Sequence, residues 1–221
     1  LEEAGKTAEA EEMWREVNAL SAREIRKHAE DSKGLFVKAT QQMSMMVGVL
    51  PDVYIDEFVR TTEGLAISSP EEVYAVIERD LLCPPPRVFR SFDREPVASA
   101  SIGQVHKARL RADRALVAVK VQHDGVGRVF AEDLGTLQVL ADMVAYWAPD
   151  LDFREAVAEL SEVVPRELDF REECRSLARA RAALLRAGSP VMVPIPVESL
   201  CGREVLVMSY VDAWPIQKLA D

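Results

Sequence analysis

One stretch in the middle of the chain limits the possible folds more than any other, because its side chains alternate as they do in a sheet. Four small residues occupy 98–101, and valines alternate with other residues from Val117 to Val121. Between them, Gln104, His106 and Ala108 alternate with Val105, Lys107 and Arg109 in an expected strand. A period of two predicts half-buried strands, and polar residues 111–114 predict a turn. The stretch therefore predicts a strand, a small-residue loop and two further antiparallel strands, the last of which contains Lys120.

Helices are expected on both sides of this sheet. Residues 8–48 contain no proline and are mostly strong helix formers, with a break near 32–34. Ser69, Pro70 and two glutamates form a typical helix start, and that helix should end near Leu82, before the prolines at 84–86. Further helices are expected at 52–62, 126–147 and 153–187, the last bent or restarted at Pro165, and a further strand at 204–208.

This order of elements predicts an α+β fold in two parts, a helical extension at 1–86 and a unit with a small antiparallel sheet at 87–221. The chain has 221 residues, 48% of them hydrophobic, which is enough for a sizeable core. A net charge of −10 argues against a nucleic-acid partner, since phosphate backbones select clustered Lys and Arg. A nucleotide is still compatible, because a phosphate site needs only a local lysine and backbone donors.

The cysteines and the N-terminus exclude other classes. Cys83, Cys174 and Cys201 form no Cys-x-x-Cys pair, so we expect free thiols in a reducing compartment and no zinc site. No apolar run approaches the ~18 residues of a membrane span. The N-terminus is acidic, shows no targeting segment and begins with Leu1, so we expect the sequence to start inside a longer one.

The hairpin and its lysine are the first candidate site. A lone strand lysine is ordinarily solvated, but in this hairpin the Lys120 ammonium can reach nucleotide phosphates while the small-residue loop covers them. That loop consists of Ala98, Ser99, Ala100 and Ser101. Alanine excludes the positive φ values open to glycine, so the loop should be stiffer than a glycine-rich one.

Two acids and a second lysine complete the candidate cleft. Glu167 and Asp169 lie two positions apart in an expected helix, so they would face different partners, one of them Lys120. Lys38 is the expected partner of the other acid, and it shares a helix face with Gln41. Apolar neighbours indicate that the Lys38 helix is partly buried, where a lone lysine is costly unless it is paired. An ordinary charged, solvated helix face is the alternative for both segments.

The strand at 204–208 runs into a possible hinge, and the backbone near Met208 and Tyr210 could hold an adenine. Taken alone, this segment is indistinguishable from any buried strand.

Together these residues resemble the UbiB/aarF-domain-containing atypical kinases, over about 34–216. The resemblance rests on residues 96–106, on Val117-Ala118-Val119-Lys120-Val121-Gln122 and on Glu167-Leu168-Asp169-Phe170, in family order and spacing. Its alanine-rich loop, nucleotide lysine and Glu-x-Asp motif map onto 98–101, Lys120, and Glu167 with Asp169. Thr40 replaces the usual glycine of the family's Lys-x-Gly-Gln motif, which puts close backbone packing there in doubt, and Ser209 and Ala213 depart from its hinge pattern.

The resemblance implies a protein-kinase-like N-lobe that ends just after the hinge, with the C-terminal lobe absent. It implies ATP as the ligand, Mg²⁺ supplied by the missing lobe, and an atypical kinase or ATPase as the intact protein. It also implies lipid or quinone metabolism such as coenzyme Q synthesis, a mitochondrial or plastid location, and a lipid, quinone or membrane surface as partner. We expect this chain alone to transfer no phosphate. A non-catalytic kinase-fold scaffold or regulator is the alternative function, and an unrelated helical adaptor is a third reading.

Overall fold

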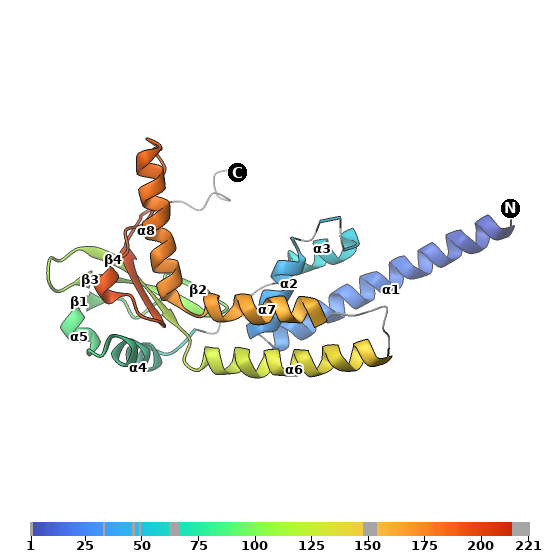
Figure 1. The fold of residues 1–221 in the computed structure, drawn as a ribbon, viewed down its shortest axis with the longest axis horizontal. Helices are drawn as coiled ribbons and strands as arrows, with labels where there is room; N and C mark the ends of the chain where they lie inside the picture. The colour runs from blue at the N-terminus through green and yellow to red at the C-terminus, as the bar shows by residue number, and fades with distance from the viewer. Residues whose placement is uncertain are drawn as a thin grey trace. The chain divides into compact units, whose positions relative to one another are not determined.

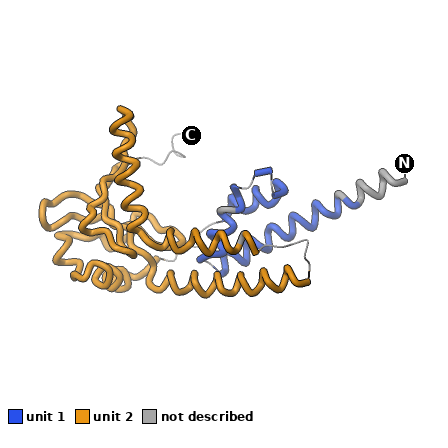
Figure 2. The backbone as a smooth tube through the Cα atoms, in the orientation of Figure 1, with its two compact units in different colours: residues 1–66 blue, residues 67–221 orange. Residues whose placement is uncertain are grey.

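The computed structural model describes residues 2–32, 34–45, 47–48, 50–61, 67–147 and 154–213. The chain divides into two compact units, residues 1–66 and residues 67–221 (Figure 2). The first unit is helical in its described part, and the second contains the sheet. The expected mixture of helices with a small antiparallel sheet is confirmed.

The first unit consists of α1 (Glu2–Ser32), α2 (Gly34–Met43) and α3 (Asp52–Phe58), which contact one another. The predicted break near 32–34 is confirmed, and Gly34 adopts a φ of 54° where the chain turns. Arg26 ties the unit together, because it binds Glu30 in its own helix at 2.7 Å and Glu57 in α3 at 2.8 Å. These bonds raise the pKa of Arg26, the one to Glu57 contributing most.

The second unit is built around a five-stranded antiparallel sheet (Figure 1). Its order is β1-β3-β4-β5, and β2 also pairs with β3. The strands are β1 (Phe89–Phe92), β2 (Ala98–Ala100), β3 (Gly103–Leu110), β4 (Leu116–Gln122) and β5 (Val205–Ser209). The alternating pattern therefore predicted β3 and β4 to within a few residues, and the apolar run at 204–208 predicted β5.

The alanine-rich segment is a strand and not a loop, which corrects the sequence prediction. Ala98 pairs with Val105, and Ala100 pairs with Gly103. Only Ser101 and Ile102 form the turn of the β2–β3 hairpin. The reason is the neighbouring strand, since alanine and serine adopt extended backbone readily when β3 supplies hydrogen-bond partners.

Helices cover both faces of the sheet (Figure 1). On one face, α4 (Pro70–Leu81) packs Val73, Val76 and Ile77 against the valines of β4 and β5. On the other face, α8 (Phe170–Arg186) packs Phe170 and Cys174 against Leu206. Along each strand, every second residue faces a helix layer, and along each helix, apolar residues with a period of 3.6 face the sheet. Together these two patterns produce the three-layer arrangement.

The division between the units lies at 66/67, whereas the sequence analysis placed it at 86/87. Helix α4 belongs to the sheet unit because Asp80 at its end binds the chain just before β5. The Asp80 carboxylate accepts from the backbone N–H groups of Arg203, Glu204 and Val205 at 3.1, 2.9 and 2.9 Å. A side chain at Gly202 would collide with this carboxylate.

Arg79 fastens the same helix from the adjacent position. Its guanidinium lies 2.9 Å from Glu204 and 3.0 Å from Asp124. These hydrogen bonds, first the one to Glu204, raise the pKa of Arg79. The predicted start of α4 is confirmed, with Ser69 and Glu72 forming a reciprocal capping box.

The remaining elements are α5 (Pro85–Val88), α6 (Val126–Trp147), α7 (Arg154–Glu167) and the short 3₁₀ turn η2 (Glu198–Leu200). Helices α6 and α7 lie side by side (Figure 1). The predicted restart in the long helical segment occurs at Phe170, a few residues after Pro165, because Asp169 caps the next helix there. None of the described helices is both long and apolar enough to cross a membrane.

Candidate functional site

Lys120 lies on the sheet face that α8 covers, and its charge has a partner in that helix. Its Nζ atom lies 2.7 Å from Oε2 of Glu173 and 4.5 Å from the centre of the Phe170 ring. The lysine side chain is 21% exposed and that of Glu173 is 39% exposed. The ion pair is therefore half-buried but reachable by solvent, as a residue that binds a charged ligand must be.

The sequence analysis named Glu167 or Asp169 as the partner of Lys120. The structure places Glu173 beside Lys120, and a contact between Lys120 and Glu167 stays a prediction. Glu167 is the last residue of α7 and Asp169 is the N-cap of α8, so the two acids do not share a helix. Asp169 accepts from the Arg171 backbone N–H at 3.1 Å and binds the Arg171 guanidinium at 2.6 and 2.8 Å. The Arg171 side chain accordingly holds the pKa of Asp169 below its usual value.

Glu173 could have been found from the periodicity of α8. Phe170 and Cys174 are buried, and Leu177 packs beside them, so positions 170, 174 and 177 define the sheet-facing stripe. Glu173 lies three residues after Phe170 and therefore on the same side of the helix. An acid at the edge of an apolar stripe is the natural partner of a lysine on the covered sheet.

The helix start that positions Glu173 is fixed by the sheet itself. The Gln122 side chain donates from Nε2 to the carbonyl of Leu168 at 2.9 Å, and the Phe170 N–H donates to the carbonyl of Arg203 at 2.9 Å. Gln122 is 4% exposed, so these bonds are shielded from water. The register between β4 and α8 thus rests on groups within a few residues of Lys120.

The β2–β3 hairpin presents its alanines on the Lys120 face. Ala98 pairs with Val105, and Val105 pairs with Lys120. Directly opposed residues of antiparallel strands share a face, so the Ala98 methyl and the Lys120 ammonium lie on the same side. Ala100 follows two residues later and lies on that side as well, whereas Ser99 points to the opposite side.

The tip of this hairpin is held by His123, just after β4, which the sequence analysis did not identify. The His123 backbone N–H donates to the carbonyl of Ile102 at 3.0 Å. Its ring Nε2 lies 3.0 Å from the carbonyl of Ala100 and its Nδ1 lies 2.8 Å from the Ser68 hydroxyl. The carbonyl can only accept, so Nε2 carries the proton and Nδ1 accepts from Ser68. The turn that contains Ser101 is therefore clamped from both sides.

A buried polar chain continues from Ser68 on the face opposite Lys120. Gln104 accepts from the Ser68 N–H at 2.7 Å, and its amide nitrogen lies 2.8 Å from His106 Nε2. His106 is fully buried and its Nδ1 lies 2.8 Å from the carbonyl of Asp93. Burial lowers the pKa of His106, and the neutral ring satisfies both contacts by donating from Nδ1 and accepting at Nε2. Gln104 and His106 stand at alternate positions of β3, opposite valines of β4. This pattern was the sequence signal for the buried hydrogen bonds.

Of the two predicted hinge residues, Met208 lies within β5 and Tyr210 follows the strand, and part of the backbone there is already engaged. Met208 pairs with Ala118 and therefore lies on the Lys120 face. The N–H groups of Ser209 and Tyr210 donate to the carbonyls of Ile195 and Leu116 at 2.8 and 3.2 Å. The Tyr210 ring lies 4.6 Å from the Lys107 ammonium.

Lys38 and Gln41 lie in α2, in the first unit. Their expected proximity to Lys120 stays a prediction. Thr40, which stands where the Lys-x-Gly-Gln motif has glycine, is 2% exposed, and its hydroxyl donates to the carbonyl of Val37 at 2.9 Å. This intrahelical bond explains how the helix accommodates a polar side chain at a buried position. Within the described residues, no group of three or more His, Cys, Asp and Glu side chains could hold a metal ion.

Comparison with known proteins identifies the family of the chain. The family model described as the ABC1 atypical kinase-like domain matches residues 60–221. The chain belongs to this family of atypical kinases.

Its curated relatives include an AarF domain-containing kinase 1 from Drosophila melanogaster, 33% identical, with 85% of this chain and 36% of that protein covered. An uncharacterized chloroplastic aarF domain-containing protein kinase from Arabidopsis thaliana is 30% identical, with 96% of this chain and 31% of that protein covered. The chain thus spans about a third of the length of these relatives. A solved structure of Rv3197 from Mycobacterium tuberculosis with erythromycin matches with a TM-score of 0.62 and 30% identity, covering 97% of this chain and 53% of that one.

Proposed function

We propose that the second unit is the ATP-binding lobe of an atypical kinase or ATPase. The observation that carries the proposal is the Lys120–Glu173 ion pair on the face where Ala98 and Ala100 of the hairpin also lie. An ammonium held by a carboxylate is positioned for phosphate oxygens, because the carboxylate limits its rotamers. ATP would supply the phosphoryl group and its electrophilic phosphorus.

The residues present suit the phosphate end of a nucleotide. Lys120 is partly exposed, the hairpin tip offers backbone groups at Ser101, and the alanine methyls leave room beside the strand. At the other end, Met208 and Ala118 would form an apolar contact for the adenine ring. Because the N–H groups of Ser209 and Tyr210 are already engaged, adenine recognition would fall to the backbone that follows Tyr210.

The wider role of the intact protein is part of the same proposal. In the full-length protein a second lobe would supply Mg²⁺ and the catalytic aspartate of phosphoryl transfer. A role in lipid or quinone metabolism, with a lipid, quinone or membrane surface as partner and a plastid or mitochondrial location, fits the family. One relative carries the word chloroplastic in its name.

Equilibrium binding of ATP to the purified chain tests the proposal. Lys120→Met should weaken binding about tenfold or more, because a charge-assisted contact contributes about 1.5–3 kcal/mol. Lys27→Met removes an identical charge from an exposed position in α1 and should leave binding unchanged. Equal affinity for wild type and Lys120→Met would remove the nucleotide site and favour the scaffold function.

A phosphotransfer assay separates binding from catalysis. The chain alone should show no turnover, because the acids that hold Mg²⁺ in kinases follow the hinge in a second lobe. Turnover that disappears in Lys120→Met would show instead that catalytic groups within these 221 residues have been overlooked.

A further inference from the structure

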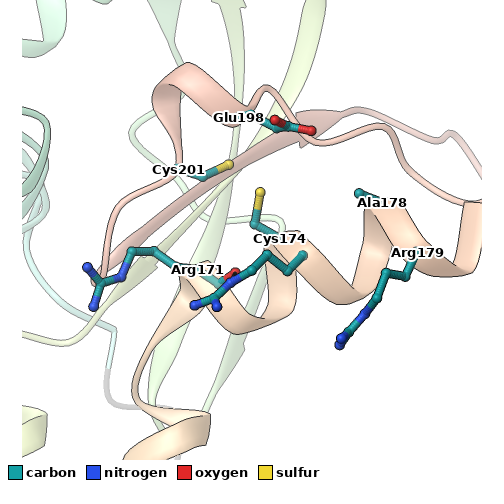
Figure 3. A pocket seen from close by; sticks show the side chains of 7 residues that line it. Arg171, Cys174, Ala178, Arg179, Glu198 and Cys201 are labelled. Atoms are coloured by element: carbon teal, nitrogen blue, oxygen red, sulfur yellow. Dashed lines mark hydrogen bonds between the residues drawn. The ribbon is translucent and has the colours of Figure 1, made fainter.

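Two thiols meet where α8 packs against the sheet, in the cluster that also contains Phe170 and Leu206. Cys174 in α8 is 7% exposed, and Cys201, just after η2, packs against it. The two sulfur atoms point toward one another (Figure 3). Both cysteines line a cavity of about 460 Å³. Cys174 is buried and Cys201 is partly exposed, so a small reagent in the cavity has access to this pair, whereas ordinary core cysteines have no such access.

The same cavity is rimmed by positive charge. Arg171, Arg175 and Arg179 recur every four residues and therefore follow one face of α8. Their side chains are solvent-exposed, and one glutamate, Glu198, also lines the cavity. Asp169 pairs with Arg171 and Glu172 pairs with Arg175, so among the described residues Arg179, which donates to the Ser176 hydroxyl, is the lining arginine outside an ion pair. A small anion would be drawn to the Arg179 guanidinium at low ionic strength.

We propose that Cys174 and Cys201 form a modification site that is oxidised to an intramolecular disulfide by an anionic low-molecular-weight disulfide. The proposal does not depend on nucleotide binding. The Cys174 thiolate attacks one sulfur of the reagent R–S–S–R, which forms a Cys174–S–S–R bond and releases RS⁻. The Cys201 thiolate then attacks Sγ of Cys174, and the second RS⁻ leaves. Two protein thiols are oxidised, one reagent disulfide is reduced to two thiols, and the two thiol protons pass to the leaving thiolates through solvent.

The order of attack follows from the surroundings of Cys201. Its thiol donates to the carbonyls of Val197 and Val207 at 3.3 and 3.5 Å. Burial raises its pKa to about 12, so it is a poor first nucleophile. Once Cys174 carries the mixed disulfide, Cys201 lies beside the sulfur it must attack, and proximity compensates for its low thiolate fraction.

The disulfide would join α8 to the segment that runs beside β5. Cys174 directly follows Glu173, the partner of Lys120, and Val197 is hydrogen-bonded to Val207 in β5. Oxidation therefore fixes the helix that carries the ion pair to the sheet that carries the lysine. Hydrogen exchange in the first two turns of α8 should slow on oxidation and recover on reduction.

The experiment treats the reduced full chain with oxidised glutathione and counts free thiols after denaturation. The count should fall from three to one, and peptide mapping should show a Cys174–Cys201 linkage. In Cys83→Ser, a control that leaves the pair intact, the count should fall from two to none. Three outcomes would each overturn the proposal: stable mixed disulfides without this linkage, a linkage through Cys83, or no loss of thiols. None of these measurements requires a substitution in the core.

A neutral reagent tests the part played by the arginines. At low salt, hydroxyethyl disulfide should react at least about threefold more slowly than oxidised glutathione, once each rate is corrected for the reagent's reactivity toward a free thiol. This difference in rate should vanish in 0.5 M NaCl, which screens the charges. Arg179→Gln should reduce the preference. Equal corrected rates at low salt would show that the reagent need not be anionic and would contradict the proposed substrate class.

Discussion

Gly103→Ala should force β3 and β4 apart beside the turn of the β2–β3 hairpin. A Cβ atom built on Gly103 falls 2.4 Å from the carbonyl oxygen of Val121 and 3.0 Å from Cα of Gln122. Ordinary contacts begin at 3.4 Å, so the two backbones must separate by about 1 Å. Both neighbours are backbone atoms of a central strand, which cannot move aside as a flexible side chain could.

The cost can be estimated from this overlap. Overpacking a rigid site costs about 1–3 kcal/mol, and separating β3 from β4 also weakens the Gly103–Gln122 pair and the adjoining Ala100–Gly103 pair. A total of about 2–4 kcal/mol is expected. With a urea m-value of about 2 kcal/mol/M, the unfolding midpoint of the second unit should fall by about 1–2 M.

A second glycine provides a control with the opposite sign. Gly135 lies in the middle of α6, and a Cβ atom there meets nothing within 4 Å. Gly135→Ala should therefore stabilise the helix by about 0.5–1 kcal/mol. Urea unfolding followed by circular dichroism, with hydrogen exchange of the β3 and β4 peptides, measures both variants. A Gly103→Ala chain within 0.5 kcal/mol of wild type would refute the close approach of the two strands.

Three further predictions concern the same unit. Asp80→Ala should destabilise the unit by about 2–4 kcal/mol, because three backbone N–H groups lose a charged acceptor. In the same urea titration the control Asp113→Ala, which removes one exposed turn bond, should cost under about 1 kcal/mol, and equal losses would contradict this reasoning. Burial depresses the pKa of His106 in the folded state, so the unfolded chain binds the proton more readily and the free energy of unfolding should fall as pH drops below about 6.5. His106→Asn should flatten this part of the pH profile of stability, and an unchanged profile would exclude His106 as its source. The double variant Ala98→Gly with Ala100→Gly should change nucleotide affinity and selectivity at a stability cost of about 0.5–1 kcal/mol per site, and unchanged binding at unchanged stability would mean that the hairpin does not touch the nucleotide.

The parts of the fold that the sequence predicted are those set by local periodicity. Strands β3 and β4 follow from period-two alternation, β5 follows from a short apolar run, and the start of α4 follows from its capping residues. Lys120 was identified because it interrupts a run of valines in such a strand. Each of these features is encoded within about ten residues.

The errors arose where contacts join distant parts of the chain. Asp80 binds residues 123–125 positions away, and this contact moves α4 into the sheet unit. Glu173 pairs with Lys120 across 53 positions. The Glu-x-Asp spacing suggested one continuous helix, but the bonds from Gln122 and Arg203 hold a break there, and that break rotates Glu173 toward the sheet.

The alanine-rich segment shows how these contacts alter the chemistry inferred from sequence. An isolated small-residue loop would be a mobile cover for phosphates, stiffened only by its alanines. Because 98–100 are a strand paired with β3, and because His123 holds the carbonyls of Ala100 and Ile102, the position of the cover is set by the sheet. Closure over a ligand would then require bending of the whole hairpin and the loss of the His123 bonds. If ATP binds beside Lys120, it meets a preformed wall, so the shape of that wall decides which phosphate geometries fit.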